Sequence, residues 1–386
     1  MKQLTFFLLS VLLLLSSCNK QDTSICDETD DLKMNQVQLI ASHNSYRLHT
    51  YQPLFDKLVA LNAVFPEFDA KGFDYTHPPL EEQFDQYGVR GIELDIYYDP
   101  NGGLFYNRLA NTLIQEPVES GLPELLEPGF KVLHVPDLDY MTNYLTFKQA
   151  LQALKNWSDA HPNHLPIFVN VETKTDGLND YVTVVGAIEP LPFTPQAADD
   201  LDQEVKAIFG NELQNVITPD KIRGNYATLK QAVEANNWLT LKEARGKVAF
   251  IIDGNYDFYI EGHPSFAGRA MFAYADADVP ECAFIIDNNA IDSQSDIEQW
   301  VAQNYIVRTR ADADTEEART GDYSKMNAAF ASGAQIISTD YYRPDPRYLT
   351  DTAWTNFTVR FPNNELVLIN HINANPTDYP NCLIGE

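Results

Sequence analysis

Eight short apolar runs alternate with segments of helical periodicity along most of this 386-residue chain. The runs are rich in Val, Ile, Leu and Phe, a composition typical of strands that are buried on both faces. They lie at residues 36–42, 89–96, 130–135, 165–171, 247–252, 283–286, 305–309 and 334–338. Strands that alternate with helices form parallel sheets. This alternation restricts the fold to the α/β class.

The number of runs favours a closed barrel over an open sheet. Eight parallel strands with their helices make a TIM barrel of roughly 250 residues, which can also carry insertions. The glycine motif GxGxxG, which marks many open doubly wound sheets, does not follow the first run. We therefore predict a single TIM-like (β/α)8 barrel domain over residues 35–386.

Three connections are much longer than one helix requires, at residues 46–87, 99–129 and 175–246. All three follow predicted strands, and in a TIM barrel such loops build the functional rim. We expect them to form long rim insertions. The first contains an apolar tract at residues 51–73, which could face a lipid surface or form a buried insertion.

The first 17 residues resemble an export signal. Lys2 precedes an apolar stretch at residues 4–15, and Ser16 and Ser17 then lead into Cys18. Small residues before a cysteine resemble the cleavage box of bacterial lipoproteins, although an ordinary signal peptide with an incidental cysteine is the alternative. We predict a lipoprotein signal peptide over residues 1–17, lipidation of Cys18, and a polar tether over residues 18–34. The protein is then an exported lipoprotein of the bacterial cell envelope, anchored at a membrane surface.

Three cysteines remain if Cys18 carries lipid: Cys26, Cys282 and Cys382. The oxidising envelope allows one disulfide, and a bond between Cys26 and Cys382 would join the chain ends. The sequence does not choose among the three possible pairs. Because there is no CxxC pair or tight Cys/His cluster, we do not expect a structural zinc site.

The charge of the chain excludes one class of partner. Acidic residues outnumber basic ones by 55 to 27, which gives a formal net charge of −28. Nucleic-acid binding needs a dominant basic surface, so it is not expected here. Nothing in the sequence predicts an obligate protein partner either.

Ionisable and amide side chains cluster at the ends of the first four predicted strands. They are His43 and Asn44, Glu93 and Asp95, His134, and Glu172 and Lys174. Because side chains alternate along a strand, Glu93 and Asp95 share one face, as do Glu172 and Lys174. The carboxyl ends of parallel strands meet at one mouth of a barrel, so these groups could converge there.

A hard metal ion would suit this set of side chains. Asn44, Glu93, Asp95 and Glu172 would offer one amide oxygen and three carboxylates, which are ligands for calcium or magnesium rather than zinc or copper. The histidines could move protons near neutral pH. Each residue alone could be purely structural, but their joint occurrence at four successive strand ends favours a single site.

Several ordered motifs carry a family resemblance. They are HNSY at 43–46, RGIELD at 90–95, LHVPDLD at 133–139, ETK at 172–174, VRTRADAD at 307–314 and GAQIISTDY at 333–341. Together they resemble the calcium-dependent, phosphatidylinositol-specific phospholipase C family of bacteria. The resemblance extends over about residues 35–345, which is nearly the whole predicted domain.

This resemblance implies a phospholipase C-like phosphodiesterase barrel with two catalytic histidines and one calcium ion. His43 would stabilise charge on the phosphoryl oxygens or activate the attacking hydroxyl. His134 would protonate the leaving diacylglycerol oxygen and later activate water. The residues that match the family's calcium ligands are Asn44, Glu93, Asp95 and Glu172, and those near its substrate contacts are Lys174, Arg308, Arg310 and Tyr341.

The expected reaction is cleavage of phosphatidylinositol-type lipids to diacylglycerol and inositol phosphate, directly or through a cyclic phosphate. The same barrel could instead hydrolyse glycerophosphodiesters, or bind lipid or inositol without catalysis. The presence of both histidines and all ligand types counts against a non-catalytic role.

Three details of the later strands leave alternatives open. Asp312 and Asp314 could hold Arg308 and Arg310 in an ion-pair network and keep them from substrate. The fifth predicted strand leads into Asp253 without a lysine pair, which counts against recognition of polyphosphorylated head groups. Asp253 and Asp287 could bind substrate hydroxyls or simply cap the following loops.

Overall fold

The computed structural model describes residues 24–62, 69–180, 183–380 and 382–386. The predicted signal peptide, Cys18 and the first part of the predicted tether lie outside the described residues. Within the described ranges, none of the helices has the length and apolar character needed to span a membrane.

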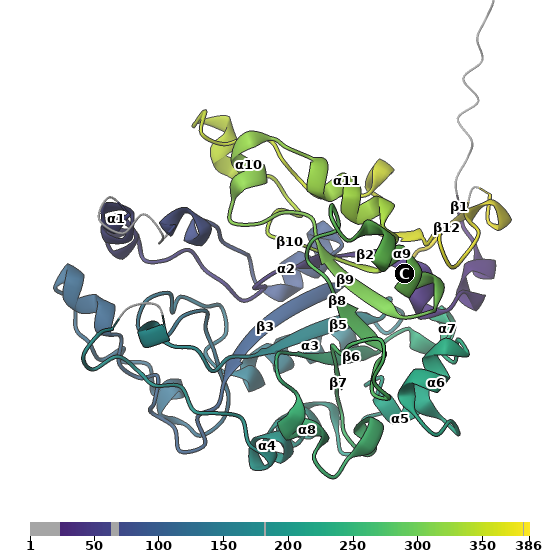
Figure 1. The fold of residues 1–386 in the computed structure, drawn as a ribbon. Helices are drawn as coiled ribbons and strands as arrows, with labels where there is room; N and C mark the ends of the chain where they lie inside the picture. The colour runs from purple at the N-terminus through teal and green to yellow at the C-terminus, as the bar shows by residue number, and fades with distance from the viewer. Residues whose placement is uncertain (1–23, 63–68, 181–182, 381) are drawn as a thin grey trace, which may run out of the picture.

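Eight parallel strands form the predicted barrel (Figure 1). Their order around the sheet is β7, β6, β5, β3, β2, β10, β9 and β8, and a parallel bridge between Tyr274 and Phe284 brings the two ends together. The strands are β2 (Val37–Ser42), β3 (Gly91–Tyr97), β5 (Ile167–Thr173), β6 (Val248–Asp253), β7 (Phe272–Ala273), β8 (Phe284–Ile286), β9 (Ile306–Arg310) and β10 (Ile336–Thr339). A nearly continuous apolar core fills the barrel and the layer beneath its helices.

One predicted barrel strand is wrong, and another was missed. Of residues 130–135, only β4 (Lys131–Val132) is a strand, and it pairs antiparallel with the end of β3. A strand that returns antiparallel to its predecessor cannot continue a parallel barrel. The barrel instead includes β7, which the sequence analysis missed because two residues are too short to show strand periodicity.

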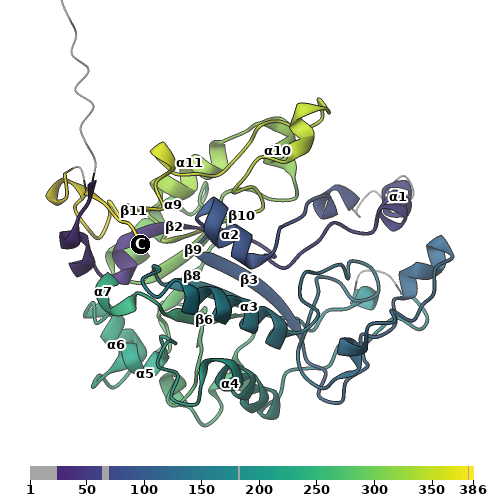
Figure 2. The same cartoon turned by 180° about the vertical axis from the view of Figure 1, so that it is seen from behind.

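Helices surround the barrel (Figures 1 and 2). Helix α3 begins with a capping box, in which the Thr146 hydroxyl accepts a hydrogen bond from the Gln149 backbone and the Gln149 side chain accepts one from the Thr146 backbone. The helices are α1 (Gln52–Leu61), α2 (Leu80–Tyr87), α3 (Phe147–Ala160), α4 (Pro195–Phe209), α5 (Pro219–Arg223), α6 (Leu229–Glu234), α7 (Leu241–Ala244), α8 (Asp257–Ile260), α9 (Gln294–Ala302), α10 (Glu316–Thr320) and α11 (Ser324–Ala331).

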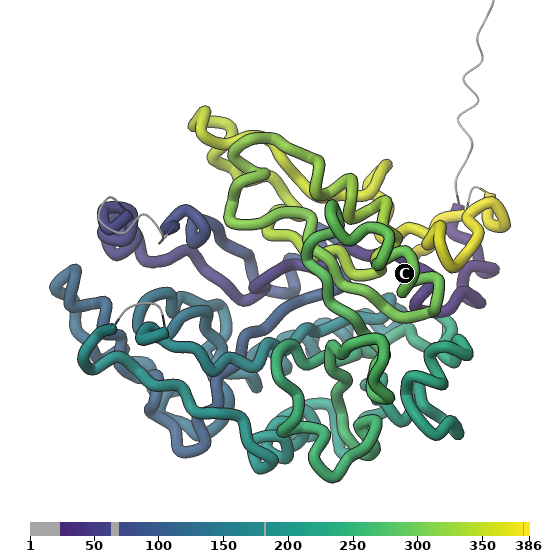
Figure 3. The backbone as a smooth tube through the Cα atoms, viewed as in Figure 1, coloured from purple at the N-terminus to yellow at the C-terminus, as the bar shows by residue number. Residues whose placement is uncertain are grey.

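The insertions after β2 and β3 and the first part of the insertion after β5 extend from one end of the barrel, as the backbone trace in Figure 3 shows, whereas α5, α6 and α7 lie toward the other end. Helix α1 contacts the 3-10 helix η4 (Leu109–Ile114) there. A second apolar cluster lies beneath them, to which α1 contributes Leu54, Phe55 and Leu58. The remaining residues of α1 are exposed, so the described part of the apolar tract, at residues 51–62 and 69–73, is partly buried and partly open to solvent.

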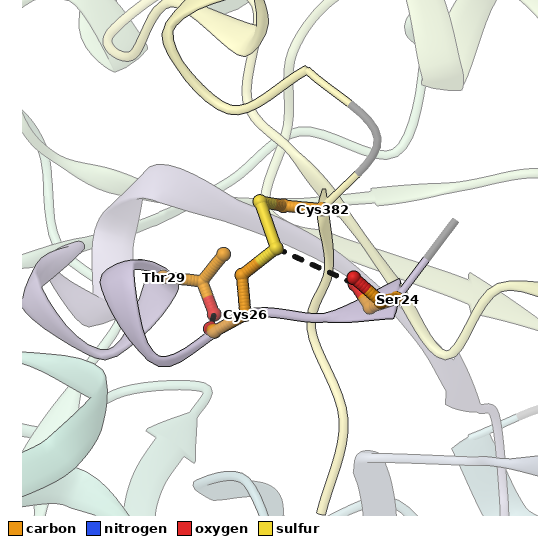
Figure 4. Close-up of a disulfide and its surroundings, with 4 residues drawn as sticks. All are labelled: Ser24, Cys26, Thr29 and Cys382. Atoms are coloured by element: carbon orange, nitrogen blue, oxygen red, sulfur yellow. Dashed lines mark hydrogen bonds between the residues drawn. A yellow bond between two sulfur atoms is a disulfide. The ribbon is translucent and has the colours of Figure 1, made fainter. Parts of the chain in front are cut away.

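The opposite end of the barrel holds both ends of the described chain. Strand β1 (Ser24–Ile25) pairs with β12 (Cys382–Leu383), and a disulfide joins Cys26 to Cys382 (Figure 4). Cys282 is buried and unpaired. A further strand, β11 (Val367–Ile369), pairs antiparallel with β2. Residues 24–34 of the predicted tether are held at this end of the barrel, which we call the floor, by the disulfide, by β1 and by the buried Leu32 and Met34.

Candidate active site

A cavity of about 380 Å³ opens at the carboxyl ends of the barrel strands. Five of the predicted site residues line it, from β3, β5 and β9 and from the turn after β2. Its lining residues are His43, Glu93, Glu172, Asp253, Ile286, Asn288, Arg308 and Arg310. The strand ends therefore converge on one mouth, as the sequence predicts.

Three carboxylates meet at the base of this cavity. Glu93 and Asp95 lie on β3, and the sheet register pairs Asp95 with Glu172 on the neighbouring strand β5. Oxygen atoms of all three side chains lie within 4.8 Å of one another. Like charges this close in a buried site repel strongly unless a cation or protons neutralise them.

Asp95 is the least neutralised of the three carboxylates. Both of its carboxylate oxygens are buried, and neither has a donor in good hydrogen-bond geometry among the described residues. Burial, followed by the nearby charge of Glu172, raises the pKa of Asp95 well above its usual value. Unpartnered hard oxygen atoms are the ligands that calcium prefers, so this cluster fits that ion.

Asn44 lies beside the same cluster. It has a left-handed backbone conformation with φ 45°, which asparagine tolerates better than most residues. Its amide nitrogen donates to the Tyr75 hydroxyl over 3.0 Å, and the Tyr46 hydroxyl lies 3.5 Å from its oxygen. Burial and the charge of Asp95 raise the pKa of Tyr46 well above its usual value, so the Tyr46 hydroxyl lies near both Asn44 and Asp95.

Cations already contact two of the three carboxylates. The Lys174 ammonium lies 3.2 Å from Glu172, and the Arg308 guanidinium forms a close ion pair with Glu93. Arg308 and Glu93 are both almost fully buried. A buried ion pair is geometrically specific, because breaking it leaves an uncompensated charge.

His43 is fixed from two sides. Its Nδ1 lies 2.8 Å from Asp340, and its Nε2 lies 3.4 Å from Glu93. Asp340 also accepts a hydrogen bond from Arg310 over 2.8 Å. Burial alone would raise the pKa of Asp340, but His43 and Arg310 reverse this and hold it well below its usual value.

The backbone of His43 has its own support. The His77 Nε2 donates to the His43 carbonyl over 2.9 Å, and the His77 Nδ1 lies 2.9 Å from the Tyr342 hydroxyl. Burial lowers the pKa of His77 to about 4, so this ring is neutral at pH 7. The neutral His77 ring therefore holds the His43 backbone in place through its hydrogen bond to the carbonyl.

His134 follows β4 and lies outside the lining of the main cavity. Its Nδ1 lies 2.8 Å from Asp139, which also contacts the buried guanidinium of Arg47. Burial alone would raise the pKa of Asp139, but Arg47 and His134 bring it to about 2. Burial lowers the pKa of His134, against the pull of Asp139, and the charge of Lys174 also contributes.

The remaining predicted substrate contacts have separate environments. Tyr341 is buried and packs against Trp354 and Phe357, so it does not line the cavity. Arg310 lines the cavity, and it also pairs with Asp340 and lies 3.5 Å from Asp312. Arg310 therefore takes part in an ion-pair network, as predicted, and still faces the cavity where substrate would bind.

Sequence reasoning missed several partners of the site. Asn170 precedes Glu172 by two positions on β5, so strand alternation could have placed it in the barrel. Its amide nitrogen donates to Asp253 over 3.2 Å, while its oxygen is buried without a partner among the described residues. Asp340 directly follows β10, which is the same signal that identified the earlier strand ends. Asn288 gave no such signal.

The arrangement agrees with a comparison to known protein families. The model of the family described as "Phosphoinositide phospholipase C, Ca2+-dependent" matches residues 32–371. This chain belongs to that family. The phospholipase C barrel, the phosphodiesterase class and the calcium dependence expected from the sequence are therefore confirmed at the level of the family.

Solved structures agree with the fold of this phospholipase C. A calcium-dependent phosphoinositol-specific phospholipase C from a Pseudomonas species, in an apo form, is 17% identical, with a TM-score of 0.51. The alignment covers 86% of this chain and 95% of that one. The myoinositol complex of such a Pseudomonas enzyme is 16% identical, with a TM-score of 0.50 and the same coverage. None of the curated proteins is significantly similar in sequence.

Proposed function

We propose that this enzyme cleaves phosphatidylinositol-type lipids into diacylglycerol and inositol phosphate, directly or through a cyclic phosphate. One observation carries the proposal. Two histidines, His43 and His134, are each fixed through Nδ1 by a buried carboxylate, and His43 also contacts a cluster of three carboxylates that includes the unpartnered Asp95. Acid–base groups beside a hard-cation site suit phosphodiester cleavage.

The residues that would hold one calcium ion are Asn44, Glu93, Asp95 and Glu172. When bound there, calcium would supply positive charge for the phosphate oxygens and lower the pKa of an adjacent hydroxyl. The orphaned oxygens of Asp95 support this assignment most directly, since burial without a partner is costly for a carboxylate.

The two histidines would divide the proton transfers. Asp340 would accept a hydrogen bond from the Nδ1–H of His43. The His43 Nε2, at the cavity, is then free of a proton and can take one from the attacking hydroxyl. Asp139 favours the charged form of His134 and so opposes the effect of burial on its pKa, and a protonated His134 would give its proton to the leaving diacylglycerol oxygen. His134 would reverse its role when water attacks a cyclic product.

Positive side chains would hold the phosphate. Arg308 and Arg310 line the cavity, and Lys174 lies beside Glu172. Guanidinium groups suit the oxygens of a phosphodiester because they donate several hydrogen bonds in one plane. Asp253 and Asn288 offer polar atoms for inositol hydroxyls, and the described lining of the cavity contains no lysine for further phosphate groups.

The rim supports a lipid substrate over a soluble glycerophosphodiester. Among the described residues, all the exposed large apolar side chains except Ile25 and Tyr226 belong to segments around the mouth of the barrel. They are Tyr51, Val59, Leu61, Leu113, Leu126, Val185, Leu191, Ile291, Tyr348 and Leu349. Apolar side chains gathered on one end are typical of a surface that enters a membrane interface.

Anchoring at the envelope completes the proposal. Lipidation of Cys18 would hold the enzyme at a membrane surface, next to lipid substrate. Replacing Cys18 with Ser should move the protein from the membrane fraction to the soluble fraction. A variant that stays in the membrane fraction would show that Cys18 is not the anchor.

The reaction can be tested with His134→Ala and phosphatidylinositol vesicles. We expect this variant to release diacylglycerol at least about a hundredfold more slowly than the wild type, because general acid–base groups typically contribute 10²–10⁴-fold. His161→Ala is the matched control, since His161 is an exposed histidine at the end of α3. A folded His134→Ala protein with most of its activity would remove that residue from the mechanism. Preference for glycerophosphoinositol over vesicles would favour the soluble substrate.

A further inference from the structure

Arg308 occupies an unusual position among the charged residues of the site. Its guanidinium Nη2 forms a close ion pair with Oε2 of Glu93, one of the proposed calcium ligands. Its other side-chain contacts are to neutral groups, the Asn288 Oδ1 at 3.1 Å and the Ser338 Oγ at 3.2 Å. Among the described residues, Glu93 is therefore the only carboxylate that Arg308 pairs with.

This ion pair is shielded from water. The side chains of Arg308 and Glu93 are only 4% and 3% exposed. Charges in such surroundings interact far more strongly than on a surface, because the effective dielectric constant is lower. A second cation at Glu93 would be repelled by the guanidinium and would also have to share the carboxylate with it.

We propose that Arg308 is an exchangeable counter-ion of the calcium site. Calcium displaces the guanidinium from Glu93, and the released guanidinium then binds the phosphate of the substrate. The inference rests on the proposed function for the identity of the ligands. No bond forms or breaks in this exchange, in which one cation replaces another at the same carboxylate.

The cavity provides a place for the released group. Arg308 lies in the lining, and its Nη1 already contacts Asn288 on the wall of the same space. A guanidinium that leaves Glu93 can turn toward a phosphate without leaving the site. Calcium and the anionic substrate then bind cooperatively, and linkage requires that each strengthen the binding of the other.

Arg310 is a natural control for this proposal. It lies two positions along β9 from Arg308 and lines the same cavity. Its partners are Asp340 and Asp312, neither of which is a proposed ligand. Arg310 therefore shares the strand, the face and the charge of Arg308 but not its contact with Glu93.

Calcium binding by isothermal titration calorimetry tests the exchange without any turnover. We expect Arg308→Met to bind calcium at least about tenfold more tightly than the wild type, within the usual range of coupling between two sites. Arg310→Met should change the affinity by less than about threefold. Unchanged or weaker calcium binding by Arg308→Met would overturn the proposal, as would an equal gain in both variants.

A wild-type crystal structure with calcium provides a second test that does not depend on how the variants fold. The proposal expects the Arg308 Nη2 to lie beyond hydrogen-bond reach of Glu93 when the ion is bound. An intact ion pair next to bound calcium would overturn it. Calcium binding that survives in Asp95→Asn would instead contradict the proposed metal site, so failure of the site and failure of the exchange can be distinguished.

Discussion

Single buried charges in this site are matched by specific partners from distant parts of the chain. Glu93 pairs with Arg308, His43 with Asp340, and His134 with Asp139, while Arg47 compensates Asp139 from behind. Pairing of this kind holds each group in one orientation, because a satisfied buried polar network is rigid. Asp95 lacks such a donor among the described residues and is the exception that points to a metal.

His77 should make the stability of the fold depend on pH. Burial lowers its pKa from 6.5 to about 4, so the unfolded chain binds a proton more readily than the folded one. This contribution is complete above pH 6.5 and is lost as the pH falls toward 4. We expect the free energy of unfolding to drop by about 3 kcal/mol across that window because of this group.

Urea unfolding at several pH values checks this prediction. His77→Gln should show a shallower loss of stability between pH 6.5 and 4 than the wild type. His371→Gln should keep the wild-type slope, because His371 is exposed. If His77→Gln loses stability with the same slope as the wild type, His77 is not the group responsible.

Residue-level prediction succeeded where a rule of local geometry applied. The two-residue period of a strand placed Glu93 beside Asp95, and parallel pairing brought them to Glu172. Strand periodicity does not indicate which acid would face Arg308 or His43, because those pairs depend on where β9 and β10 lie in the closed barrel. Long-range ion pairs of this kind leave no local signal.

Helix α1 is the element that connects the barrel to its proposed lipid surface. Leu54, Phe55 and Leu58 hold one face of it in the second apolar cluster, while Val59 and Leu61 are exposed. Burial and lipid contact are the two alternatives that the sequence allows for this tract. The structure shows burial for Leu54, Phe55 and Leu58, and lipid contact by the exposed Val59 and Leu61 remains a proposal. Residues 64, 65 and 68 of the tract lie outside the described residues.

The double variant Val59→Asp, Leu61→Asp tests the lipid contact. We expect binding to phosphatidylinositol vesicles and hydrolysis of them to fall at least about tenfold, since each lost apolar side chain weakens membrane contact. Hydrolysis of monomeric short-chain substrate should be unchanged. Tyr226→Asp, an exposed site between α5 and α6, is the control. Undiminished vesicle binding by the double variant would rule out α1 as the lipid contact.

Strand prediction failed where an element was too short or too atypical. β7 has two residues and is held by its neighbours β6 and, through one bridge, β8. The run at residues 130–135 has an apolar composition like a barrel strand, but the only strand in it, β4, turns back on β3. In both cases tertiary pairing, rather than local composition, decides the role of the segment.

The whole molecule has two different ends. The cavity lies at the carboxyl ends of the barrel strands, at the end from which the rim insertions extend. Strands β1 and β12, next to the Cys26–Cys382 disulfide, lie at the opposite end (Figures 1 and 2). At the floor, Glu386 forms a close ion pair with Arg90 and accepts a hydrogen bond from the Leu165 backbone. The Cys26–Cys382 disulfide thus lies at the end of the barrel opposite the candidate active site.

Removing the disulfide should lower stability without altering the site. We expect Cys26→Ser, Cys382→Ser to lose about 2–4 kcal/mol of unfolding free energy, since a crosslink restricts the unfolded chain. Its activity at 25 °C should match that of the wild type. Cys282→Ser is the control and should still respond to reductant. If reductant leaves the melting temperature of the wild type unchanged, the disulfide does not contribute.

The excess of acidic over basic residues affects how the whole molecule approaches its substrate. A chain with a net charge of −28 repels an anionic lipid at long range, so local cations must provide the attraction. Arg308, Arg310 and Lys174 supply part of it at the mouth. A calcium ion among Glu93, Asp95 and Glu172 would supply the rest.

The most direct test of this account is the calcium dependence of diacylglycerol release from phosphatidylinositol vesicles. Chelation should abolish the activity of the wild type, and added calcium should restore it. Asp95→Asn should remain inactive and should bind calcium at least about tenfold more weakly. Activity that persists under chelation, or a fully active Asp95→Asn variant, would contradict the central claim that these buried carboxylates hold the catalytic calcium.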